Sequence, residues 1–256
     1  MRDVLEAVAA GSISVDEAEA QLAGYLTGEV GRFDTARERR RGIPEGILAD
    51  GKTPAEVAAL ADTALRTTEH AIVTRTTDDH RAAIREHLGE EHPDATVDVR
   101  ERSGVVIVHG PDYAPPAVDA TVGVVAAGTA DAAVAGEAAA VLEEIGVGVE
   151  RIHDVGVANL TRITDRIPEL RTVDVLIVAA GREGALPTVV AGLVDVPVIG
   201  VPVSCGYGHG ADGEAALAGI LQSCTILSVV NIDAGFVAGA QAGLIARAIA
   251  AARTDT

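Results

Sequence analysis

The second half of the chain alternates continuous apolar runs with helix-compatible segments, and this pattern constrains the fold more than any other feature. The five runs cover residues 121–126, 147–152, 175–180, 196–201 and 226–232. A strand that is apolar along its whole length must be covered on both faces, and parallel sheets achieve this by returning through helices. The sequence therefore predicts an α/β domain in which a parallel sheet lies between two helical layers.

The loops that follow four of these strands carry the polar residues and glycines that a binding site needs. They cover residues 127–131, 180–184, 202–210 and 231–235. In open parallel sheets, ligands bind outside the carboxyl ends of the strands. We therefore expect the functional site at this edge of the sheet, with both Cys205 and Cys224 near it.

The first half of the chain has a different pattern, which predicts a smaller α+β domain over residues 1–116, followed by the α/β domain over 117–256. Three prolines between residues 111 and 116 indicate a linker. The elements expected before it are a helix capped by Ser14 and Glu17, a helix that begins at Thr53-Pro54, a strand over 71–75 and a hairpin over 95–109 that turns near Ser103 and Gly104.

Composition excludes several classes of function. The chain has 38 Asp and Glu against 20 Lys and Arg, and this net charge of −18 opposes binding to nucleic acid or to an anionic membrane. The uncharged stretch 215–232 approaches the length of a membrane span, but its polar residues favour a buried helix and strand. The start lacks the apolar core of a signal peptide, and two cysteines make no disulfide framework. We expect a soluble cytoplasmic protein.

The acidic residues are spread along the whole chain, and Lys52 is the only lysine. Such a surface is typical of proteins adapted to high salt, where screening weakens the repulsion between like charges. Halophilic adaptation is therefore a hypothesis about the habitat of this protein. This hypothesis says nothing about the function of the protein.

Two loops and a basic cluster are candidate ligand sites. Gly128, Thr129 and Asp131 lie between a strand and a helix, where they would either hold a phosphate or simply cap the helix. Three glycines in the segment 206–210 indicate a backbone that approaches another group closely. The four arginines between residues 37 and 41 form either a solvated helix end or an anion-binding cluster.

The two cysteines have a structural and a catalytic interpretation. A buried cysteine is usually a small apolar filler. His209 close to Cys205 would lower the pKa of that thiol and make it reactive. The seven histidines show no zinc-ligand spacing, and no Gly-x-Ser-x-Gly motif of the α/β hydrolases is present.

Taken in order, these motifs resemble the LarB family of nickel-pincer cofactor biosynthesis, which is related to the PurE-like aminoimidazole ribonucleotide carboxylases and mutases. Residues 179–202 are similar to the core of those purine enzymes. The pieces similar to LarB are Asp34, Arg37, 40–45, 51–53, 74–75, 128–131, 154–157, 183–187, 206–208, 223–224 and 230–236. The sequence differs from the family pattern at Arg182, where an apolar residue is usual, and at Thr161, where histidine is usual.

The resemblance implies a reaction on nicotinic acid adenine dinucleotide. LarB-like enzymes add CO2 or bicarbonate to C5 of the pyridinium ring and hydrolyse the phosphoanhydride, which releases AMP. The product is pyridinium-3,5-biscarboxylic acid mononucleotide. The resemblance further implies a PurE-like or flavodoxin-like fold, a homo-octamer and Mg2+ near the phosphates, with no organic cofactor.

The resemblance also assigns roles to residues of this chain. Cys224 matches the family nucleophile, and Glu183 and Asp233 are candidates to move the C5 proton or to hold Mg2+. The expected substrate-binding residues are Arg40, Arg75, Gly128, Thr129, Asp131, Gly206, Tyr207 and Gly208. Two alternatives stay open: a purine-pathway carboxylase or mutase, which needs no cysteine, and a non-catalytic nucleotide-binding protein.

Overall fold

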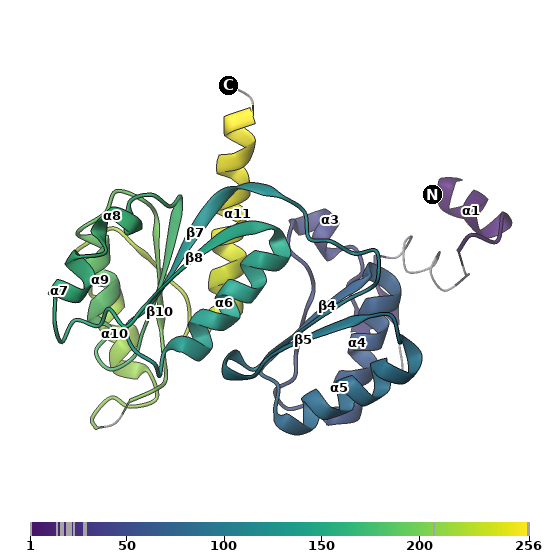
Figure 1. Ribbon diagram of the computed structural model, residues 1–256, viewed down its shortest axis with the longest axis horizontal. Helices are drawn as coiled ribbons and strands as arrows, with labels where there is room; N and C mark the ends of the chain where they lie inside the picture. Colours follow the sequence, from purple (N-terminus) through teal and green to yellow (C-terminus); the bar gives the residue numbers. More distant parts are fainter. Residues whose placement is uncertain are drawn as a thin grey trace. The chain divides into compact units, whose positions relative to one another are not determined.

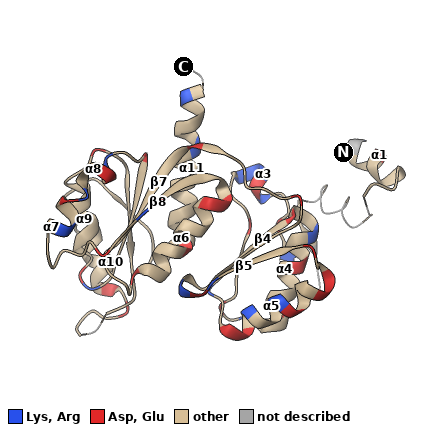
Figure 2. Cartoon of the chain, viewed as in Figure 1, with Lys and Arg blue, Asp and Glu red and all other residues tan. Residues whose placement is uncertain are grey.

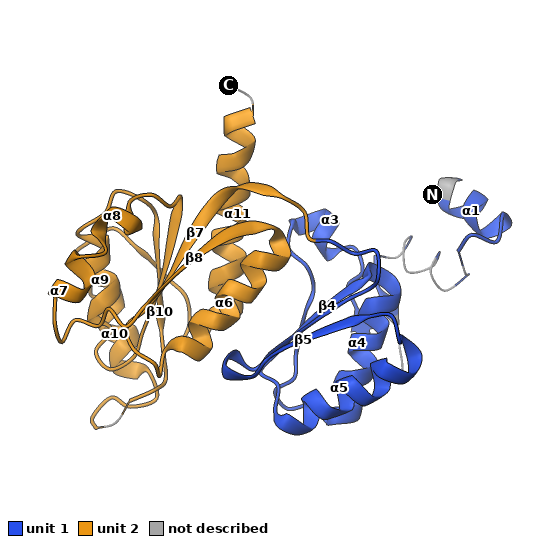
Figure 3. Ribbon diagram, in the orientation of Figure 1, with its two compact units in different colours: residues 1–114 blue, residues 115–256 orange. Residues whose placement is uncertain are grey.

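A computed structural model describes residues 2–13, 15, 18, 22, 24–27, 30–206 and 208–254. The expected cap at Ser14 and Glu17 lies outside these residues. The chain divides into two compact units, Met1–Ala114 and Pro115–Thr256 (Figure 3). The division falls within the proline-containing segment 111–116.

Unit 1 contains a four-stranded mixed sheet with the order β3-β4-β6-β5. Only β3 and β4 are parallel, so the unit is α+β, as predicted. Two helices pack against each other, and α4 also packs against the sheet (Figure 1). The strands are β3 (Gly46–Leu48), β4 (His70–Thr74), β5 (Thr96–Arg100) and β6 (Val105–His109), and the two helices are α4 (Pro54–Thr68) and α5 (Asp78–Glu91).

The other elements among the described residues of unit 1 precede this sheet. The strands β1 (Leu26–Thr27) and β2 (Arg32–Phe33) form a separate antiparallel pair. They are flanked in sequence by the helices α1 (Arg2–Ala9) and α3 (Arg37–Arg41). The core of the unit is built from buried aliphatic side chains of α4, α5 and the four-stranded sheet, together with Phe33 of β2.

Local sequence explains two elements of unit 1. Helix α4 begins with a capping box, in which the backbone N–H of Thr53 donates to Glu56 Oε2 at 2.7 Å and that of Glu56 donates to Thr53 Oγ1 at 3.3 Å. The hairpin of β5 and β6 turns through the 3-10 helix Glu101–Ser103 to Gly104, which has a φ of +63°. Both predictions are confirmed.

Unit 2 is a five-stranded sheet in which every neighbouring pair is parallel. Its order, β8-β7-β9-β10-β11, is the flavodoxin-like order when the strands are renumbered within the unit. The strands are β7 (Val118–Ala126), β8 (Val147–His153), β9 (Val175–Ala180), β10 (Val198–Pro202) and β11 (Ser228–Val229). Each predicted apolar run is therefore a strand, although the last one pairs over two residues only.

Helices cover both faces of this sheet and complete the predicted three layers (Figure 1). One face is covered by α6 (Ala132–Ile145) and α11 (Gly235–Thr254), and the other by α9 (Ala185–Ala191) and α10 (Glu214–Leu221). Two short helices, α7 (Thr161–Thr164) and α8 (Ile167–Leu170), lie in the connection from β8 to β9. The uncharged stretch 215–232 is thus a helix and a strand, as predicted.

Helix α11 is long and apolar enough to cross a membrane by length and composition alone. Its small residues are instead buried, and α11 packs against α6 and β7. A Cβ on Gly239 would lie 2.6 Å from the carbonyl oxygen of Ala138, so the two helices approach too closely for any larger residue. The helix therefore belongs to the layer that covers the sheet.

Acidic side chains lie on both units (Figure 2). If the net charge of −18 reflects adaptation to salt, screening of the repulsion should stabilise the fold. We expect the melting temperature to rise as KCl increases from about 0.1 M towards a few molar, because the Debye length shortens over this range. A flat or falling melting curve would remove the halophilic hypothesis and leave the enzymatic one unaffected.

His70 should make the stability of unit 1 depend on pH. Burial lowers the pKa of its ring to about 4, although a hydrogen bond to the carbonyl of Thr68 acts in the opposite direction. Above pH 6.5 the ring is neutral in both the folded and the unfolded chain, so it does not oppose folding. As the pH falls from 6.5 towards 4, the unfolded chain binds a proton that the folded chain does not, and the free energy of unfolding falls. We expect His70→Asn to remove about 1.4 kcal/mol per pH unit of the dependence of unfolding free energy in this window, measured by urea denaturation. The same change at the exposed His153 should leave the dependence intact.

Candidate active site

The strand order of unit 2 creates a switch point between β7 and β9. The chain leaves β7 towards β8 on one side, and it leaves β9 towards β10 on the other. Connections that diverge in this way open a crevice at the carboxyl ends of the two strands. The loops 127–131 and 181–184 lie there, as the sequence predicted.

Asp131 joins three loops at this point. Its Oδ2 accepts the backbone N–H of Gly128 at 2.8 Å, and its Oδ1 accepts that of Gly181 at 3.0 Å. The thiol of Cys205 also donates to Oδ1, at 3.3 Å. Asp131 is 5% exposed, and its side chain makes no capping hydrogen bond to α6. The helix-capping interpretation is therefore wrong for Asp131. The carboxylate instead holds the ends of β7, β9 and β10 together.

The thiol of Cys205 is held in its neutral form. Burial, together with the hydrogen bond and the charge of Asp131 and the charge of Asp233, raises its pKa to about 11. The expectation that His209 lowers this pKa is therefore wrong, because burial and the carboxylates of Asp131 and Asp233 raise it. Cys205 acts here as a hydrogen-bond donor at neutral pH.

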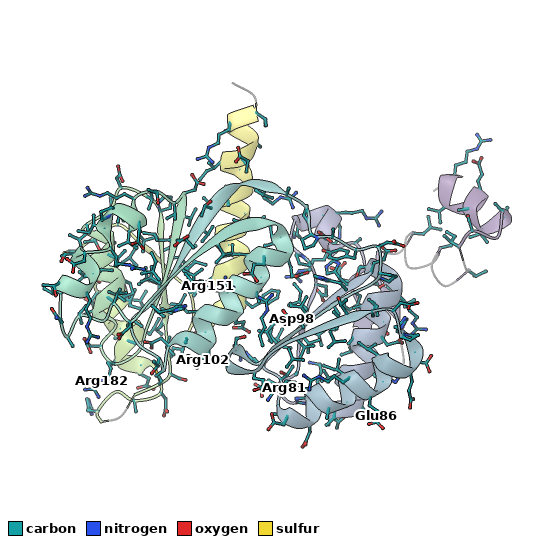
Figure 4. The ribbon with its side chains drawn as sticks, viewed as in Figure 1. Arg81, Glu86, Asp98, Arg102, Arg151 and Arg182 are labelled. Carbon is teal, nitrogen blue, oxygen red and sulfur yellow. The ribbon has the colours of Figure 1, made fainter. Side chains whose placement is uncertain are left out.

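A cavity of about 320 Å3 lies at this edge of unit 2. The residues around it include Arg182 and Glu183 from the loop after β9, and Cys205, Gly206, Gly208 and His209 from the loop after β10. Arg182 is labelled in Figure 4 on the edge of unit 2 where these loops lie. Tyr207 lies outside the described residues. The cavity volume is within the range of small-molecule sites.

Glycines allow the Glu183 loop to lie directly on α10. Gly184 has a φ of +65°, and a Cβ there would lie 2.5 Å from the carbonyl oxygen of Ala216. On the helix, a Cβ on Gly219 would lie only 2.1 Å from the carbonyl oxygen of Glu183. The position of the Glu183 carboxylate therefore depends on two residues without side chains.

Gly219→Ala tests this dependence. The methyl group would force the backbone of Glu183 away from α10, and misplacing a reacting group by about 1 Å can cost 10²-fold in rate. We expect any activity that depends on the Glu183 carboxylate to fall by roughly tenfold or more. The melting temperature should fall by several degrees, because overpacking against the backbone costs about 1–3 kcal/mol. The matched control is Gly89→Ala in α5, where a Cβ meets nothing within 4 Å and activity should be unchanged. Equal activities of the two variants would contradict the proposed position of Glu183.

Asp233 joins the last two strands at the same edge. Its Oδ1 accepts the backbone N–H of Ser204 at 2.9 Å, and its own N–H donates to the carbonyl of Pro202 at 2.9 Å. Its φ of +53° is a strained backbone conformation for a residue with a side chain. Among the described residues, no group of three His, Cys, Asp or Glu is arranged to hold a metal ion.

Comparisons with known proteins agree with this architecture. A family model described as AIR carboxylase matches residues 121–256, and one described as LarB/PurE-like N-terminal domain matches residues 25–108. An uncharacterized protein of Methanocaldococcus jannaschii is 35% identical over 96% of this chain and 97% of its own length. The chain belongs to the LarB family.

The relation to PurE is also visible in the comparisons of this LarB-family chain. The N5-carboxyaminoimidazole ribonucleotide mutase of Thermotoga maritima is 33% identical over 36% of the chain and 54% of its own length. The mutase of Pyrococcus horikoshii is 31% identical over 44% of the chain and 59% of its own length. The chain is thus an enzyme of the carboxylase and mutase type.

The structure does not bring Cys224 to the cavity. Cys224 lies between α10 and β11, in the connection that enters the strand, whereas the cavity lies where strands end. A five-residue strand such as β10 separates the two edges by roughly 16 Å. The expectation that both cysteines lie at the carboxyl edge is therefore wrong for Cys224, which is exposed on the opposite edge.

The other predicted residues divide between the two units. Gly128, Asp131, Glu183, Gly206, Gly208 and Asp233 all lie on loops at the carboxyl edge of unit 2, as does the exposed Thr129. Arg40 lies in α3 and Arg75 follows β4, both in unit 1. Arg75 has a φ of +58°.

Sequence reasoning missed the part played by Ser204 and the connection from Asp131 to Cys205. Two of the three partners of Asp131 lie 50 and 74 residues further along the chain. No local spacing could reveal these contacts. The sequence indicated only that these loops follow strands and therefore lie at the same edge of the sheet.

Proposed function

We propose that this protein carboxylates C5 of the pyridinium ring of nicotinic acid adenine dinucleotide with CO2 or bicarbonate and hydrolyses the phosphoanhydride to release AMP. This reaction opens nickel-pincer cofactor synthesis. The observation that carries the proposal is a switch-point cavity in an AIR carboxylase domain whose preceding unit matches the LarB/PurE-like N-terminal domain.

The reaction needs a nucleophile because a pyridinium ring is too electron-poor to attack CO2. A thiolate that adds to C4 or C6 gives a neutral dihydropyridine, in which C5 has enamine character. C5 then forms a bond to the carbon of CO2. Loss of the C5 proton to a base and departure of the thiolate restore the aromatic ring, so the thiol is regenerated in each turnover.

Cys205 is poorly suited to this role. With a pKa of about 11, only about one thiol in 10,000 is ionised at pH 7. The sulfur is also engaged with Asp131. We therefore assign Cys205 to positioning the loop after β10 and keep Cys224 as the nucleophile.

Cys224 can reach a cavity only if a second copy of the chain supplies it. It is exposed, and so are two apolar side chains near it in sequence: Leu221, the last residue of α10, is 61% exposed, and Ile226 on the connection is 97% exposed. Contiguous exposed apolar side chains mark contact surfaces. The proposal thus includes a homo-oligomer, for which the family resemblance suggests an octamer, in which each cavity receives Cys224 from a neighbour.

Carboxylates and glycines on the loops at the carboxyl edge of unit 2 support the remaining steps. Glu183 is an exposed carboxylate on the wall, placed to accept the C5 proton. Glu183 and Asp233 offer the oxygen donors that Mg2+ prefers, and one or two carboxylates are enough when substrate phosphates supply the rest. Mg2+ held in this way would neutralise the phosphoanhydride. In this proposal the backbone N–H groups of Gly206 and Gly208 bind phosphate oxygens.

Mass spectrometry of the products tests the proposal. The full chain is incubated with bicarbonate, Mg2+ and either nicotinic acid adenine dinucleotide or aminoimidazole ribonucleotide. We expect a bicarbonate-dependent gain of about 44 daltons on the nicotinate product and release of AMP. A gain on aminoimidazole ribonucleotide alone would establish the purine reaction instead, and no product from either would favour a binding protein.

A further inference from the structure

Helix α11 begins two residues after Asp233, and its first turn is capped from another helix. Ala234 precedes the helix, and its carbonyl accepts the N–H of Ala238 at 3.0 Å. An alanine side chain offers no acceptor to the N–H groups of the first turn, which a polar N-cap residue normally satisfies. Glu137 of α6 supplies one instead, because its Oε2 accepts the backbone N–H of Phe236 at 3.1 Å.

The packing of α6 against α11 is close at this contact (Figure 1). Glu137 is 5% exposed. At Gly235, the first residue of α11, a Cβ would lie 2.4 Å from the carbonyl oxygen of Val134 and 2.7 Å from Glu137 Oε2. The start of α11 is therefore held against α6 by a buried carboxylate on one helix and by a residue without a side chain on the other.

The cap from Glu137 affects the candidate site because Asp233 lies just before the capped turn. Asp233 has a left-handed φ of +53°, and its Oδ1 accepts the backbone N–H of Ser204 at 2.9 Å. A residue with a side chain keeps such a conformation only where its surroundings enforce it. The bond to Ser204 holds Asp233 on one side, and the capped first turn of α11 holds it on the other.

Helix α6 carries both ends of this connection. Asp131, at the N-cap position of α6, accepts the thiol of Cys205 at 3.3 Å, and Cys205 directly follows Ser204. Hydrogen bonds thus close a ring from Asp131 to the loop after β10, from that loop to Asp233, and from the start of α11 back to α6 through Glu137. Loss of one bond in a closed ring loosens groups that the bond itself does not join.

We propose that Glu137 is a positioning residue of the candidate site, which holds the Asp233 carboxylate in place through the first turn of α11. The part that Asp233 plays in catalysis rests on the proposed function, whereas the hydrogen bonds that hold it do not. In the proposed reaction, Asp233 is one of two carboxylates offered to the substrate. Misplacing such a group by about 1 Å can cost 10²-fold in rate.

Amide hydrogen exchange of the full chain tests the proposal without any substrate. We expect the backbone N–H of Ser204 to exchange about tenfold faster or more in Glu137→Ala, because the Asp233 carboxylate is no longer held against it. Glu144→Ala is the matched control. Glu144 is 2% exposed and lies about two turns further along α6, so this substitution also removes a buried carboxylate and lowers the melting temperature. It should leave the exchange of Ser204 unchanged.

Two further substitutions separate the reach of the side chain from its charge. Glu137→Gln keeps the length and an acceptor oxygen, so Ser204 should stay protected. Glu137→Asp keeps the charge but is one carbon shorter, so the exchange of Ser204 should approach that of the alanine variant, and this variant replaces Glu137→Ala if the latter does not fold. Unchanged protection of Ser204 in the shortened variants, or equal loss in Glu144→Ala, would overturn the proposal.

Kinetics separate this inference from the proposed function. Glu137→Ala should lower kcat for carboxylation of nicotinic acid adenine dinucleotide by about tenfold or more, and Glu137→Gln should restore most of it. If the chain carboxylates no substrate but the exchange of Ser204 responds as expected, the positioning role stands and the proposed reaction is wrong. If the dinucleotide is carboxylated and Ser204 exchanges in Glu137→Ala as it does in the unsubstituted chain, the positioning role is wrong and the reaction stands.

Discussion

Replacing Cys224 with serine is expected to abolish carboxylation of nicotinic acid adenine dinucleotide. A serine hydroxyl is scarcely ionised at neutral pH, so the addition to the pyridinium ring is lost and the rate falls by roughly 10³-fold or more. The fold should survive because the side chain is exposed and the change in volume is small. The measurement is the bicarbonate-dependent product, together with the mass of any protein–substrate adduct.

Cys205→Ser is the matched control for this variant. The serine hydroxyl still donates to Asp131, so the loop after β10 keeps its position and most activity is retained. Full turnover by Cys224→Ser would contradict the assignment of the nucleophile. Complete loss of activity in Cys205→Ser alone would then indicate Cys205 instead.

Mixed assemblies test whether Cys224 acts across a subunit boundary. Cys224→Ser and Glu183→Gln are each expected to be inactive when purified alone. If every site combines Cys224 of one copy with Glu183 of another, dissociation and random reassembly of an equal mixture restores about a quarter of the sites in a symmetric oligomer. If both residues came from one chain, no site would be restored.

Asp131→Asn is expected to cause the largest loss of stability among the variants of this site. The carboxylate accepts two backbone N–H groups and one thiol while 5% exposed. An amide has one acceptor oxygen, and its NH2 group faces a donor. We expect the free energy of unfolding to fall by about 3 kcal/mol, because a charge-assisted bond is lost and a buried donor is left without an acceptor. Chemical denaturation measures this change.

The same variant should alter the reactivity of Cys205. Asp131 raises the pKa of this thiol both through the hydrogen bond and through its charge, so its removal moves the pKa down from about 11. In a Cys224→Ser background, alkylation by iodoacetamide should therefore begin at a lower pH. Asp154→Asn changes an exposed carboxylate just after β8 and should shift stability by less than about 0.5 kcal/mol. An unchanged alkylation profile in Asp131→Asn would show that Asp131 does not control the thiol.

The sequence alone determined the architecture of both units and the edge of the sheet at which the site lies. Five apolar runs separated by helical segments predict a parallel sheet that is covered by helices on both faces. The loops that follow the strands of such a sheet lie at one edge. The capping box of Thr53 and Glu56 and the hairpin that turns at Gly104 are local, because their partners lie within a few residues. Glu183 and Asp233 were found at the correct edge for the same reason.

The tertiary structure decided which groups at the site meet one another. Asp131 was expected to serve the phosphate or its own helix, but two of its three partners, Gly181 and Cys205, come from loops that a local pattern cannot connect to it. Cys224 and Asp233 are nine residues apart, yet strand β11 lies between them and places them on opposite edges of the sheet. Residues close in sequence also lie close in space within one loop or one turn of a helix. Across a strand the chain travels from one edge to the other, and packing of the layers determines which distant loops it meets.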